Sequence, residues 1–379
     1  MKLVIISNAP IVIKNGKDYL YAPYLKEVRL WAKHVESIEF CCPIWKKNET
    51  LLVEQFKKSE FYYTFRELYD FNITTPIQII KTIIALPKIL YTLFIVMKNA
   101  DHIHLRCPGN VGLLACLVQI FFPSKPKTAK YAGNWDPKAK QPWSYRLQKW
   151  ILNNTFLTRN MQVLVYGNWE GTSKNIKPFF TATYTESEAE EARSLLSKKI
   201  LGVNDTIKFI FVGTLSEGKR PIYALKLWHQ LVKYLPNSTI EFYGEGTLRN
   251  ELKEYIQKNN LDACVILKGN QTKEIVEKAY KKAHFLFLAS KSEGWPKVVA
   301  EAMFWGCVPL TTNISCVNEM IGNGSRGILL SLNDNEDIEN ILNCIKQPEL
   351  YSKMSELGKK WSAQYTVEKF EIEIKKLMV

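Results

Sequence analysis

The sequence reads SEGWPKVVAEAM over residues 292–303, and this order of charged, aromatic and apolar residues predicts a loop that leads into a helix. Glu293 and Glu301 are separated by seven residues. Pro296, between them, suits the first helical turn, where its missing N–H has no helical partner to lose. Residues 297–305 are mostly apolar and predict a buried helix. Glu301 lies inside this run, where an ionised carboxylate is costly unless a partner group is present.

Glu293 lies in the loop before the predicted helix, beside backbone N–H groups that the helix itself does not use. Such a helix start favours a nearby anion. One ligand would explain the whole pattern: a sugar nucleotide whose sugar meets Glu293, whose phosphates face the helix start and whose ribose meets Glu301. The alternative is a capping glutamate followed by a surface glutamate, and the spacing by itself does not distinguish the two.

The rest of the chain alternates between strand-like and helix-like segments, which is typical of parallel sheets with crossover helices. The predicted strands are residues 3–7, 37–41, 101–106, 127–132, 163–166, 207–212, 238–243, 264–268, 284–288, 308–312 and 327–330. The other predicted helices are residues 24–33, 111–121, 221–234, 248–258 and 273–282.

Two glycine-rich turns follow predicted strands in the second half. The first, GTLSEGKR over residues 213–220, opens a helix. Small residues let the backbone approach a phosphate there, and Lys219 offers a charge-assisted donor. The alternative is an ordinary basic helix start. The second turn, Gly244-Glu245-Gly246, is a weaker signal because any tight turn uses glycine.

The cysteines predict reduced, buried thiols in a cytosolic protein. They form no CxxC pair and are scattered among apolar neighbours, at Cys41, Cys42, Cys107, Cys116, Cys264, Cys307, Cys316 and Cys344. Residues 2–7 read as a strand rather than as a signal peptide. The length of 379 residues suits two domains.

The positive charge is concentrated in the first half of the chain. Residues 1–190 hold 25 Lys and Arg against 15 Asp and Glu, a net charge of +10, whereas residues 191–379 hold 26 against 22, a net charge of +4. A basic first half predicts an anionic partner there, which is a nucleic acid, an anionic membrane or a phosphate-bearing acceptor. The basic residues are dispersed and form no recognisable nucleic-acid module, so a membrane surface is favoured.

Residues 77–98 form a long apolar stretch with lysines at positions 81, 88 and 98. Pro87 and Lys88 interrupt it, and neither side reaches about 18 uncharged apolar residues, which makes it a poor membrane span. We expect a helix pair packed in the core. The alternative is an interfacial surface that docks on a bilayer with its basic flanks.

With its neighbours, the 292–303 stretch resembles the Glu-x7-Glu signature of family 4 glycosyltransferases, which are retaining enzymes with the GT-B fold. The family commonly has Glu-Gly-Phe followed by Gly or Pro, where this chain has Glu293-Gly294-Trp295-Pro296 and then Glu301. The resemblance is strong over about residues 200–330 and extends to the rest of the chain by architecture only.

The resemblance implies an α/β fold of the GT-B type, in which two doubly wound Rossmann-like domains face a central cleft. It implies an N-terminal acceptor-binding domain at residues 1–190 and a C-terminal nucleotide-sugar-binding domain at residues 191–360. It also implies that the last helix, about residues 361–379, packs back on the first domain.

The resemblance further assigns roles to residues. Glu293 would orient the donor sugar, and Lys219 would bind the diphosphate. Thr214 stands where the family usually has arginine, so Arg220 would compensate or Thr214 would donate a hydroxyl hydrogen bond. The predicted catalytic residues are Glu293, Lys219 and Asn134. The predicted donor-binding residues are Gly213, Thr214, Lys219, Arg220, Gly244, Gly294, Trp295, Pro296, Lys297, Val298 and Glu301.

The histidine that this family usually places near the donor sugar is not evident in the first half. His102 and His104 alternate along a predicted strand, so one of them is expected to face the core. The loop at residues 133–136 lies where that histidine is expected, and Asn134 would supply the hydrogen bond instead. Arg106, at the end of a strand, is a candidate for the wall that faces the acceptor.

The resemblance and the charge together predict a retaining glycosyltransferase that moves a sugar from a UDP- or GDP-sugar to a glycan or lipid-linked acceptor in capsule, lipopolysaccharide or other surface polysaccharide assembly. No metal and no other cofactor are expected, because protein cations and helix starts would stabilise the leaving diphosphate. We expect a cytoplasmic protein attached peripherally to the inner face of the cell membrane. The alternatives are a GT-B nucleotide-sugar epimerase and a non-catalytic module that binds a sugar nucleotide or a membrane.

Overall fold

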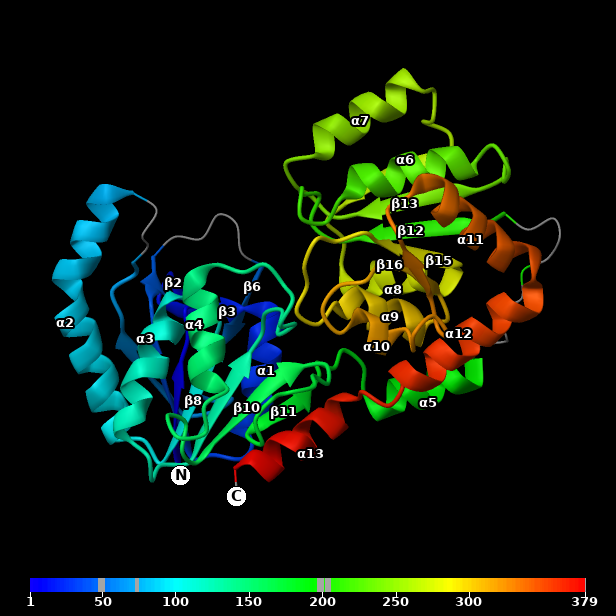
Figure 1. Cartoon of the computed structure of the whole chain (residues 1–379). Coiled ribbons are helices and arrows are strands. Elements are labelled where there is room, and N and C mark those ends of the chain that lie inside the picture. Colours follow the sequence, from blue (N-terminus) through cyan, green and yellow to red (C-terminus); the bar gives the residue numbers. More distant parts are fainter. Residues whose placement is uncertain (47–51, 72–74, 196–200, 202–205, 379) are drawn as a thin grey trace. The chain divides into compact units, whose positions relative to one another are not determined.

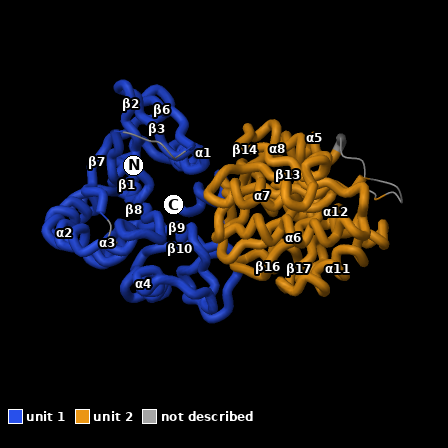
Figure 2. Tube along the Cα trace, turned by 90° about the horizontal axis from the view of Figure 1, so that it is seen from above, with its two compact units in different colours: residues 1–179, 371–379 blue, residues 180–370 orange. Residues whose placement is uncertain are grey.

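The chain folds into two compact units, which Figure 1 shows as ribbons and Figure 2 as a tube. The residues that the computed structural model describes are 1–46, 52–71, 75–195, 201 and 206–378. Unit 1 comprises Met1–Phe179 with Glu371–Val379, and unit 2 comprises Phe180–Phe370. The sequence placed the division at residue 190. The contacts in the structure place this division before helix α5 (Glu186–Leu195), so α5 belongs to unit 2. In agreement, Glu188 of α5 pairs with Lys273 of unit 2 at 3.1 Å.

Unit 1 is built around a parallel sheet of seven strands. In spatial order they are β11 (Ile176–Phe179), β10 (Met161–Tyr166), β9 (Lys127–Tyr131), β8 (His102–Cys107), β1 (Lys2–Ile6), β4 (Ser37–Cys42) and β7 (Tyr63–Glu67). The chain runs outward from β1 to β4 and β7 and then returns to β8, so the strand order reverses between β1 and β8.

A second, four-stranded sheet in unit 1 was not predicted. Its strands in order are β5 (Ile44–Trp45), β2 (Ile11–Lys14), β3 (Lys17–Tyr21) and β6 (Val53–Phe56). The β2–β3 hairpin turns at Asn15 and Gly16, whose φ angles are 52° and 67°. Two successive positive φ angles are what a type I′ hairpin turn requires, and Asn-Gly is its favoured sequence.

The helices of unit 1 are α1 (Ala22–Ala32), α2 (Pro76–Lys98), α3 (Asn110–Val118), the 3₁₀ turn η1 (Gln119–Phe121) and α4 (Trp143–Leu152). Helix α2 packs beside α3, and α3 packs beside α4. The connections β7–α2–β8, β8–α3–β9 and β9–α4–β10 all cross the sheet in the same direction. Right-handed crossovers therefore place these three helices on one face of the sheet.

Helix α2 corrects the expectation of a core-packed helix pair. It is one continuous helix with Pro87 inside it. Its buried residues are Ile89, Leu93, Val96 and Met97. The first half of the helix buries no residue, because neither α3 nor the sheet covers it. Among the described residues, α2 is the one helix whose length and composition would suit a membrane span.

His102 and His104 also differ from expectation. Both are buried, because residues two apart on a strand point to the same face. The ring nitrogens His102 Nε2 and His104 Nδ1 lie 3.0 and 2.8 Å from the hydroxyl of Thr128 on the neighbouring strand. The pair is therefore part of the core of unit 1.

Unit 2 is built around a six-stranded parallel sheet. Its strands in order are β14 (Val265–Gly269), β13 (Thr239–Tyr243), β12 (Lys208–Val212), β15 (Phe285–Leu288), β16 (Val308–Thr312) and β17 (Ile328–Leu330). Its other helices are α6 (Pro221–Leu231), α7 (Arg249–Lys258), α8 (Lys273–Lys282), α9 (Lys297–Phe304), α10 (Val317–Met320), α11 (Asp334–Lys346) and α12 (Pro348–Ser362).

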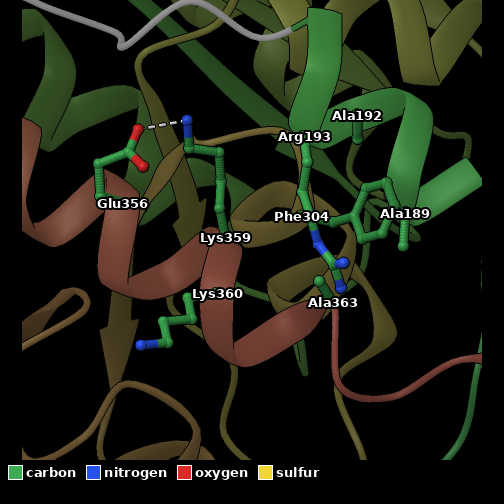
Figure 3. A pocket seen from close by; sticks show the side chains of 8 residues that line it. All are labelled: Ala189, Ala192, Arg193, Phe304, Glu356, Lys359, Lys360 and Ala363. Carbon is green, nitrogen blue, oxygen red and sulfur yellow. Dashed lines mark ion pairs between the residues drawn. The ribbon is translucent and has the colours of Figure 1, made fainter.

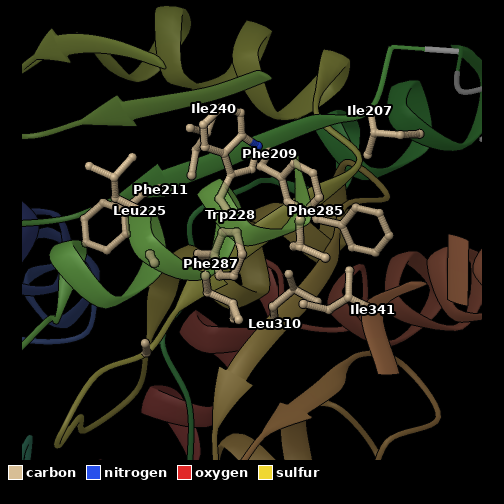
Figure 4. Close-up of a cluster of buried hydrophobic side chains, with 14 of the residues drawn as sticks. Ile207, Phe209, Phe211, Leu225, Trp228, Ile240, Phe285, Phe287, Leu310 and Ile341 are labelled. Carbon is tan, nitrogen blue, oxygen red and sulfur yellow. The ribbon is translucent and has the colours of Figure 1, made fainter. Parts of the chain in front are cut away.

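Aromatic side chains of the central strands form the core of unit 2 (Figure 4). Phe209 on β12 stacks on Phe285 and Phe287 of β15, with ring centroids 5.3 and 5.6 Å apart. Trp228 of α6 is fully buried against the same layer. Burying rings of this size contributes a large part of the hydrophobic stabilisation of such a sheet.

The predicted terminal helix is broken into α12 and α13 (Val367–Leu377). Helix α12 belongs to unit 2, whereas Glu371 and the residues after it belong to unit 1. Within unit 1, Glu371 pairs with Lys33 at 2.6 Å, just after α1. All eight cysteines are free; seven are buried and Cys264 is half-buried.

The buried histidine pair predicts that unfolding depends on pH. Burial lowers the pKa of His102 to about 4 and that of His104 to about 3, whereas an unfolded histidine titrates near ~6.5. Because the unfolded state binds protons first, this contribution to stability is complete above about pH 6.5 and falls by about 1.4 kcal/mol per pH unit for each histidine below it, down to the folded pKa.

Urea unfolding measured at several pH values between about 7 and 5 tests this linkage. The double variant His102→Asn with His104→Asn should show a flatter pH dependence over that window than the wild type. The variant His229→Asn, in unit 2, controls for the loss of a histidine. A double variant with the wild-type slope would contradict the assignment.

Candidate functional site

Two loops of unit 2 leave neighbouring strands at the point where the strand order reverses. From β12 the chain continues to β13 and β14 on one side, and from β15 it continues to β16 and β17 on the other. Residues 213–220, here called the β12 loop, follow β12, and residues 289–296, the β15 loop, follow β15. Ligands of parallel sheets bind beyond the carboxyl ends of the strands at such a reversal.

The two loops are joined by an ion pair between predicted site residues. The Lys219 ammonium donates to Glu293 Oε1, and the two side chains are 30% and 11% exposed. Arg220 Nη1 also donates to the carbonyl of Ala289 at 3.3 Å, and the Lys291 N–H donates to the carbonyl of Gly218 at 2.7 Å. The structure thus brings together a cation and a carboxylate that are 74 residues apart in the sequence.

The glycines of the two turns allow an unusually close approach of backbones. A Cβ built on Gly244 would lie 1.9 Å from the carbonyl oxygen of Gly213, and one on Gly246 would lie 2.4 Å from that of Leu215. The Gly213 N–H donates to Tyr243 O, and the Leu215 N–H donates to Glu245 O, both at 2.9 Å. The second turn therefore packs against the β12 loop and holds it through these two hydrogen bonds.

The helices that follow the loops begin close to the predicted positions. Arg220 precedes α6 with a left-handed φ of 50°. Helix α9 begins at Lys297, so Pro296 is the residue before the helix rather than its first helical residue. Val298 is the second helical residue and is half-buried. Thr214, in the β12 loop, is exposed.

Hydrogen bonds from the last residue of β16 and from the loop after it hold the β15 loop in place. The Ser315 hydroxyl donates to the carbonyl of Gly294 at 2.9 Å, and the Thr312 hydroxyl donates to that of Ser290 at 2.7 Å. The ring of Trp295 stacks on Trp361, with centroids 6.0 Å apart. The contacts of this tryptophan with α12 indicate that it positions the loop.

Glu301 has partners inside the protein. The Thr183 hydroxyl donates to Glu301 Oε1 at 3.0 Å. Burial and the nearby Glu301 carboxylate raise the pKa of the Tyr280 hydroxyl, which therefore also lies close to Glu301. Tyr184 fixes this segment, because its ring stacks on Phe304 with centroids 4.1 Å apart. The sequence argument took the burial of Glu301 as a sign of a ribose, but these hydroxyls already account for it. Its ribose role stays a prediction that rests on the resemblance.

This geometry agrees with what the comparison with protein families finds. Residues 193–361, which contain both loops and the ion pair, match the family of glycosyl transferases group 1. The match covers less than half of the chain and lies within unit 2. This match agrees with the predicted transferase class over residues 193–361.

Curated relatives match part of this chain over part of their own length. The uncharacterized glycosyltransferase MJ1178 of Methanocaldococcus jannaschii is 30% identical over 135 residues, which are 35% of this chain and 38% of the relative. The UDP-Gal:alpha-D-GlcNAc-diphosphoundecaprenol alpha-1,3-galactosyltransferase of Escherichia coli is 29% identical over 164 residues, which are 42% of each protein. The matches therefore span less than half of the length of either relative.

A solved structure extends the similarity to the fold of both units. The crystal structure of Anabaena HepE in complex with UDP matches 99% of this chain and 99% of its own, with a TM-score of 0.67 at 15% identity. A match at this identity shows the fold alone. It confirms the GT-B architecture of two α/β units that the sequence predicted.

In unit 1, Asn134 lies in the loop after β9. It is buried, and its Oδ1 accepts a hydrogen bond from the Asp136 N–H at 2.9 Å. Its main-chain carbonyl accepts from the Gln141 side chain. These bonds shape the loop, and the proposed bond from Asn134 to a sugar stays a prediction.

A buried charged group in unit 1 was not foreseen. Glu27 of α1 accepts from the Lys130 ammonium at 2.9 Å and lies 3.6 Å from Arg106, whose guanidinium is stacked over the Tyr24 ring at 3.9 Å. Burial alone would raise the pKa of Glu27, but Lys130 and Arg106 outweigh it and lower that pKa to about 2. Two lysines within the predicted strand at residues 127–132 were the sequence signal that could have indicated this cluster.

A cavity of about 250 Å³ in unit 2 does not coincide with the candidate site (Figure 3). Its charged lining residues are Arg193, Lys359, Lys360 and Glu356, and the last of these pairs with Lys359. None of the predicted site residues lines it. In the described part of the chain, no three His, Cys, Asp or Glu side chains lie close enough to hold a metal ion.

The close approach at Gly244 predicts a large effect of a single methyl group. Gly244→Ala should destabilise unit 2 by about 2–4 kcal/mol, because the new Cβ would overlap the Gly213 carbonyl and the φ of 142° is strained for alanine. Gly218→Ala is the matched control in the β12 loop, since its Cβ would meet nothing closer than 4.0 Å. Urea unfolding should show a change within about 0.5 kcal/mol for the control. Equal stability of the two variants would contradict the tight turn.

Proposed function

We propose that the chain is a retaining glycosyltransferase of the family 4 type, which moves a sugar from a UDP- or GDP-sugar to a glycan or lipid-linked acceptor in surface polysaccharide assembly. The observation that carries the proposal is the ion pair between Lys219 and Glu293 across the strand-order reversal of unit 2. In the proposal Lys219 binds an anion and Glu293 binds hydroxyl groups, so the pair would hold both binding groups side by side. A nucleotide sugar needs both groups within the length of one diphosphate and one sugar ring.

In the proposed complex, the diphosphate binds Lys219, with Arg220 and the backbone N–H groups of the β12 loop and the start of α9 beside it. Glu293 accepts hydrogen bonds from sugar hydroxyls and orients the ring. The glycine turn at Gly244 packs against the β12 loop and holds it in position. Lys297 and Val298 contribute through the first turn of α9.

The proposed reaction exchanges one bond at the anomeric carbon for another. The bond between that carbon and the diphosphate oxygen breaks, and an acceptor hydroxyl forms a bond on the same face of the sugar. The diphosphate leaves with the electron pair, and its oxygen receives the proton of the acceptor hydroxyl. Lys219, Arg220 and the helix-start amides stabilise the negative charge that develops on the leaving group. Glu293 holds the sugar and forms no covalent bond.

The acceptor is assigned from the relatives and from charge. The printed name of the Escherichia coli relative includes a diphosphoundecaprenol acceptor, which is a lipid-linked sugar. Unit 1 carries the excess of basic residues, which suits an acceptor that bears a diphosphate. We assign acceptor binding to unit 1, where Arg106 and Asn134 lie near the carboxyl ends of β8 and β9.

A screen of nucleotide sugars tests the proposal. A thermal-shift comparison of UDP-, GDP-, ADP- and CMP-sugars identifies the donor, and product analysis with a lipid-linked acceptor follows. Release of the nucleoside diphosphate together with a new glycosidic bond of retained configuration supports the proposal. A change of configuration within the free nucleotide sugar would identify an epimerase instead. Binding with neither reaction would identify a non-catalytic module.

The assignment of Lys219 predicts a selective loss of turnover. Lys219→Ala should lower the transfer rate about 10²–10³-fold, the usual effect of removing one donor to a developing anion. The melting temperature should change little, because the side chain is partly exposed. Lys291→Ala, in the exposed part of the β15 loop, is the matched control and should keep the wild-type rate. A wild-type rate for Lys219→Ala would show that Lys219 does not stabilise the leaving diphosphate, and Arg220 would then be the next candidate for that role.

The assignment of Glu301 predicts weaker nucleotide binding. Glu301→Ala should lower the affinity for the free nucleoside diphosphate by about 1.5–3 kcal/mol, because ribose hydroxyls lose a charged acceptor. Thr183→Ala is the control, since it removes a partner of Glu301 and keeps the carboxylate. Calorimetry is the measurement. Unchanged affinity in Glu301→Ala would show that the carboxylate serves only Thr183 and Tyr280.

A further inference from the structure

Helix α2 presents an apolar stripe to solvent. Ile77, Ile80, Ile84, Tyr91 and Phe94 recur at spacings of three and four or seven residues, which places them on one helix face. Ile77, Ile84 and Tyr91 are 67%, 74% and 68% exposed. We call these five residues the α2 stripe. An exposed, contiguous apolar surface of this kind indicates a partner.

One neighbouring aromatic side chain extends this surface. Phe121 of η1 is exposed and lies beside Phe94, with ring centroids 6.4 Å apart. Helix α4, on the same face of the sheet, exposes Trp143 and Trp150. Tryptophan and tyrosine favour the boundary between water and lipid, where one end of the ring is apolar and the other is hydrated.

The charges around the stripe have one sign. Lys81, Lys88 and Lys98 are exposed on α2, and the helix contains no acidic residue. Residues 71–169, which include α2, α3 and α4, hold 12 Lys and Arg against 2 Asp and Glu, a net charge of +10. This segment therefore accounts for the whole excess charge of residues 1–190.

The topology excludes α2 as a membrane span. The helix has 23 residues, so it is about 34 Å long, close to the thickness of a bilayer core of about 30 Å. It connects β7 to β8, which lie in the same sheet with β4 and β1 between them. A spanning α2 would put β7 and β8 on opposite sides of a bilayer. The helix can only lie along a membrane surface, with its buried residues toward the sheet.

We propose that unit 1 docks on an anionic lipid bilayer through the α2 stripe, with Lys81, Lys88 and Lys98 at the lipid headgroups. Amphipathic surface helices bind in this way, through an apolar face bordered by lysines. A second copy of the chain is a poor occupant, because each copy would bring the same positive charge to the interface. The docking goes beyond the transfer reaction proposed above and does not depend on it.

Vesicle flotation of the full-length protein, without any nucleotide sugar, tests the docking. The wild type should float with vesicles of phosphatidylcholine and phosphatidylglycerol, bind vesicles of phosphatidylcholine alone much more weakly, and dissociate as salt is added. The variant Lys81→Gln with Lys88→Gln and Lys98→Gln should bind anionic vesicles about 100-fold more weakly, since each lysine near the surface contributes about fivefold.

A second variant tests the apolar contact. Ile80→Ser with Ile84→Ser should weaken vesicle binding about tenfold or more, because two side chains no longer enter the bilayer. The matched control is Ile275→Ser with Ile372→Ser, which changes two isoleucines exposed on α8 and α13 and should bind like the wild type. Circular dichroism should be unchanged in both, since all four side chains are exposed.

Three outcomes would overturn the docking. The first is equal binding to anionic and neutral vesicles, or no binding to either, at low salt. The second is wild-type binding by the Ile80→Ser, Ile84→Ser variant. The third is a wild-type dimer that this variant converts to a monomer, which would make the stripe an interface between copies. None of these bears on the transfer reaction, so the two proposals fail separately.

Discussion

The parallel arrangement of the strands in the two large sheets determines where side chains from distant parts of the sequence can come together in this protein. Each parallel connection must cross back over a face of the sheet, so the carboxyl ends of all strands open at one edge. In unit 2, β12 lies between β13 and β15. After β12 the chain continues to the strands on one side of the sheet, and after β15 it continues to the strands on the other side. The β12 and β15 loops are therefore neighbours, and Lys219 and Glu293 meet although α6, α7 and α8 separate them in the sequence.

The large sheets were predictable because a strand buried on both faces is a continuous apolar run, as in residues 208–212. The β2–β3 hairpin was missed although Asn15-Gly16 is a strong local signal for it. The misreading of α2 has a different cause. Apolar composition predicts a helix but cannot distinguish a helix covered by other elements from one left at the surface. Only the path from β7 to β8 shows how little of it the sheet and α3 cover.

Some features of the candidate site depend on residues that are close in the sequence, and others depend on residues that are far apart. The turn at Gly244 was predictable because its geometry is set by a few consecutive residues. The hydrogen-bond partner of Glu301 was not, because Thr183 is 118 residues away in the sequence. A carboxylate in an apolar helix signals that some partner exists and does not identify it. Trp295 is a similar case, since its ring packs on Trp361 of a helix far along the chain.

Under the proposed function, the bond between Lys219 and Glu293 would affect the order of events in a catalytic cycle. Any ligand that takes the lysine must also offer the largely buried carboxylate new hydrogen bonds, since breaking one side of such a pair is costly. In the proposed complex, an intact nucleotide sugar would make both exchanges. A nucleoside diphosphate, which has lost its sugar, makes only the first, and the ion pair competes with it for the lysine. The same contact that aligns the two loops would thus discriminate against the spent donor and hasten its departure.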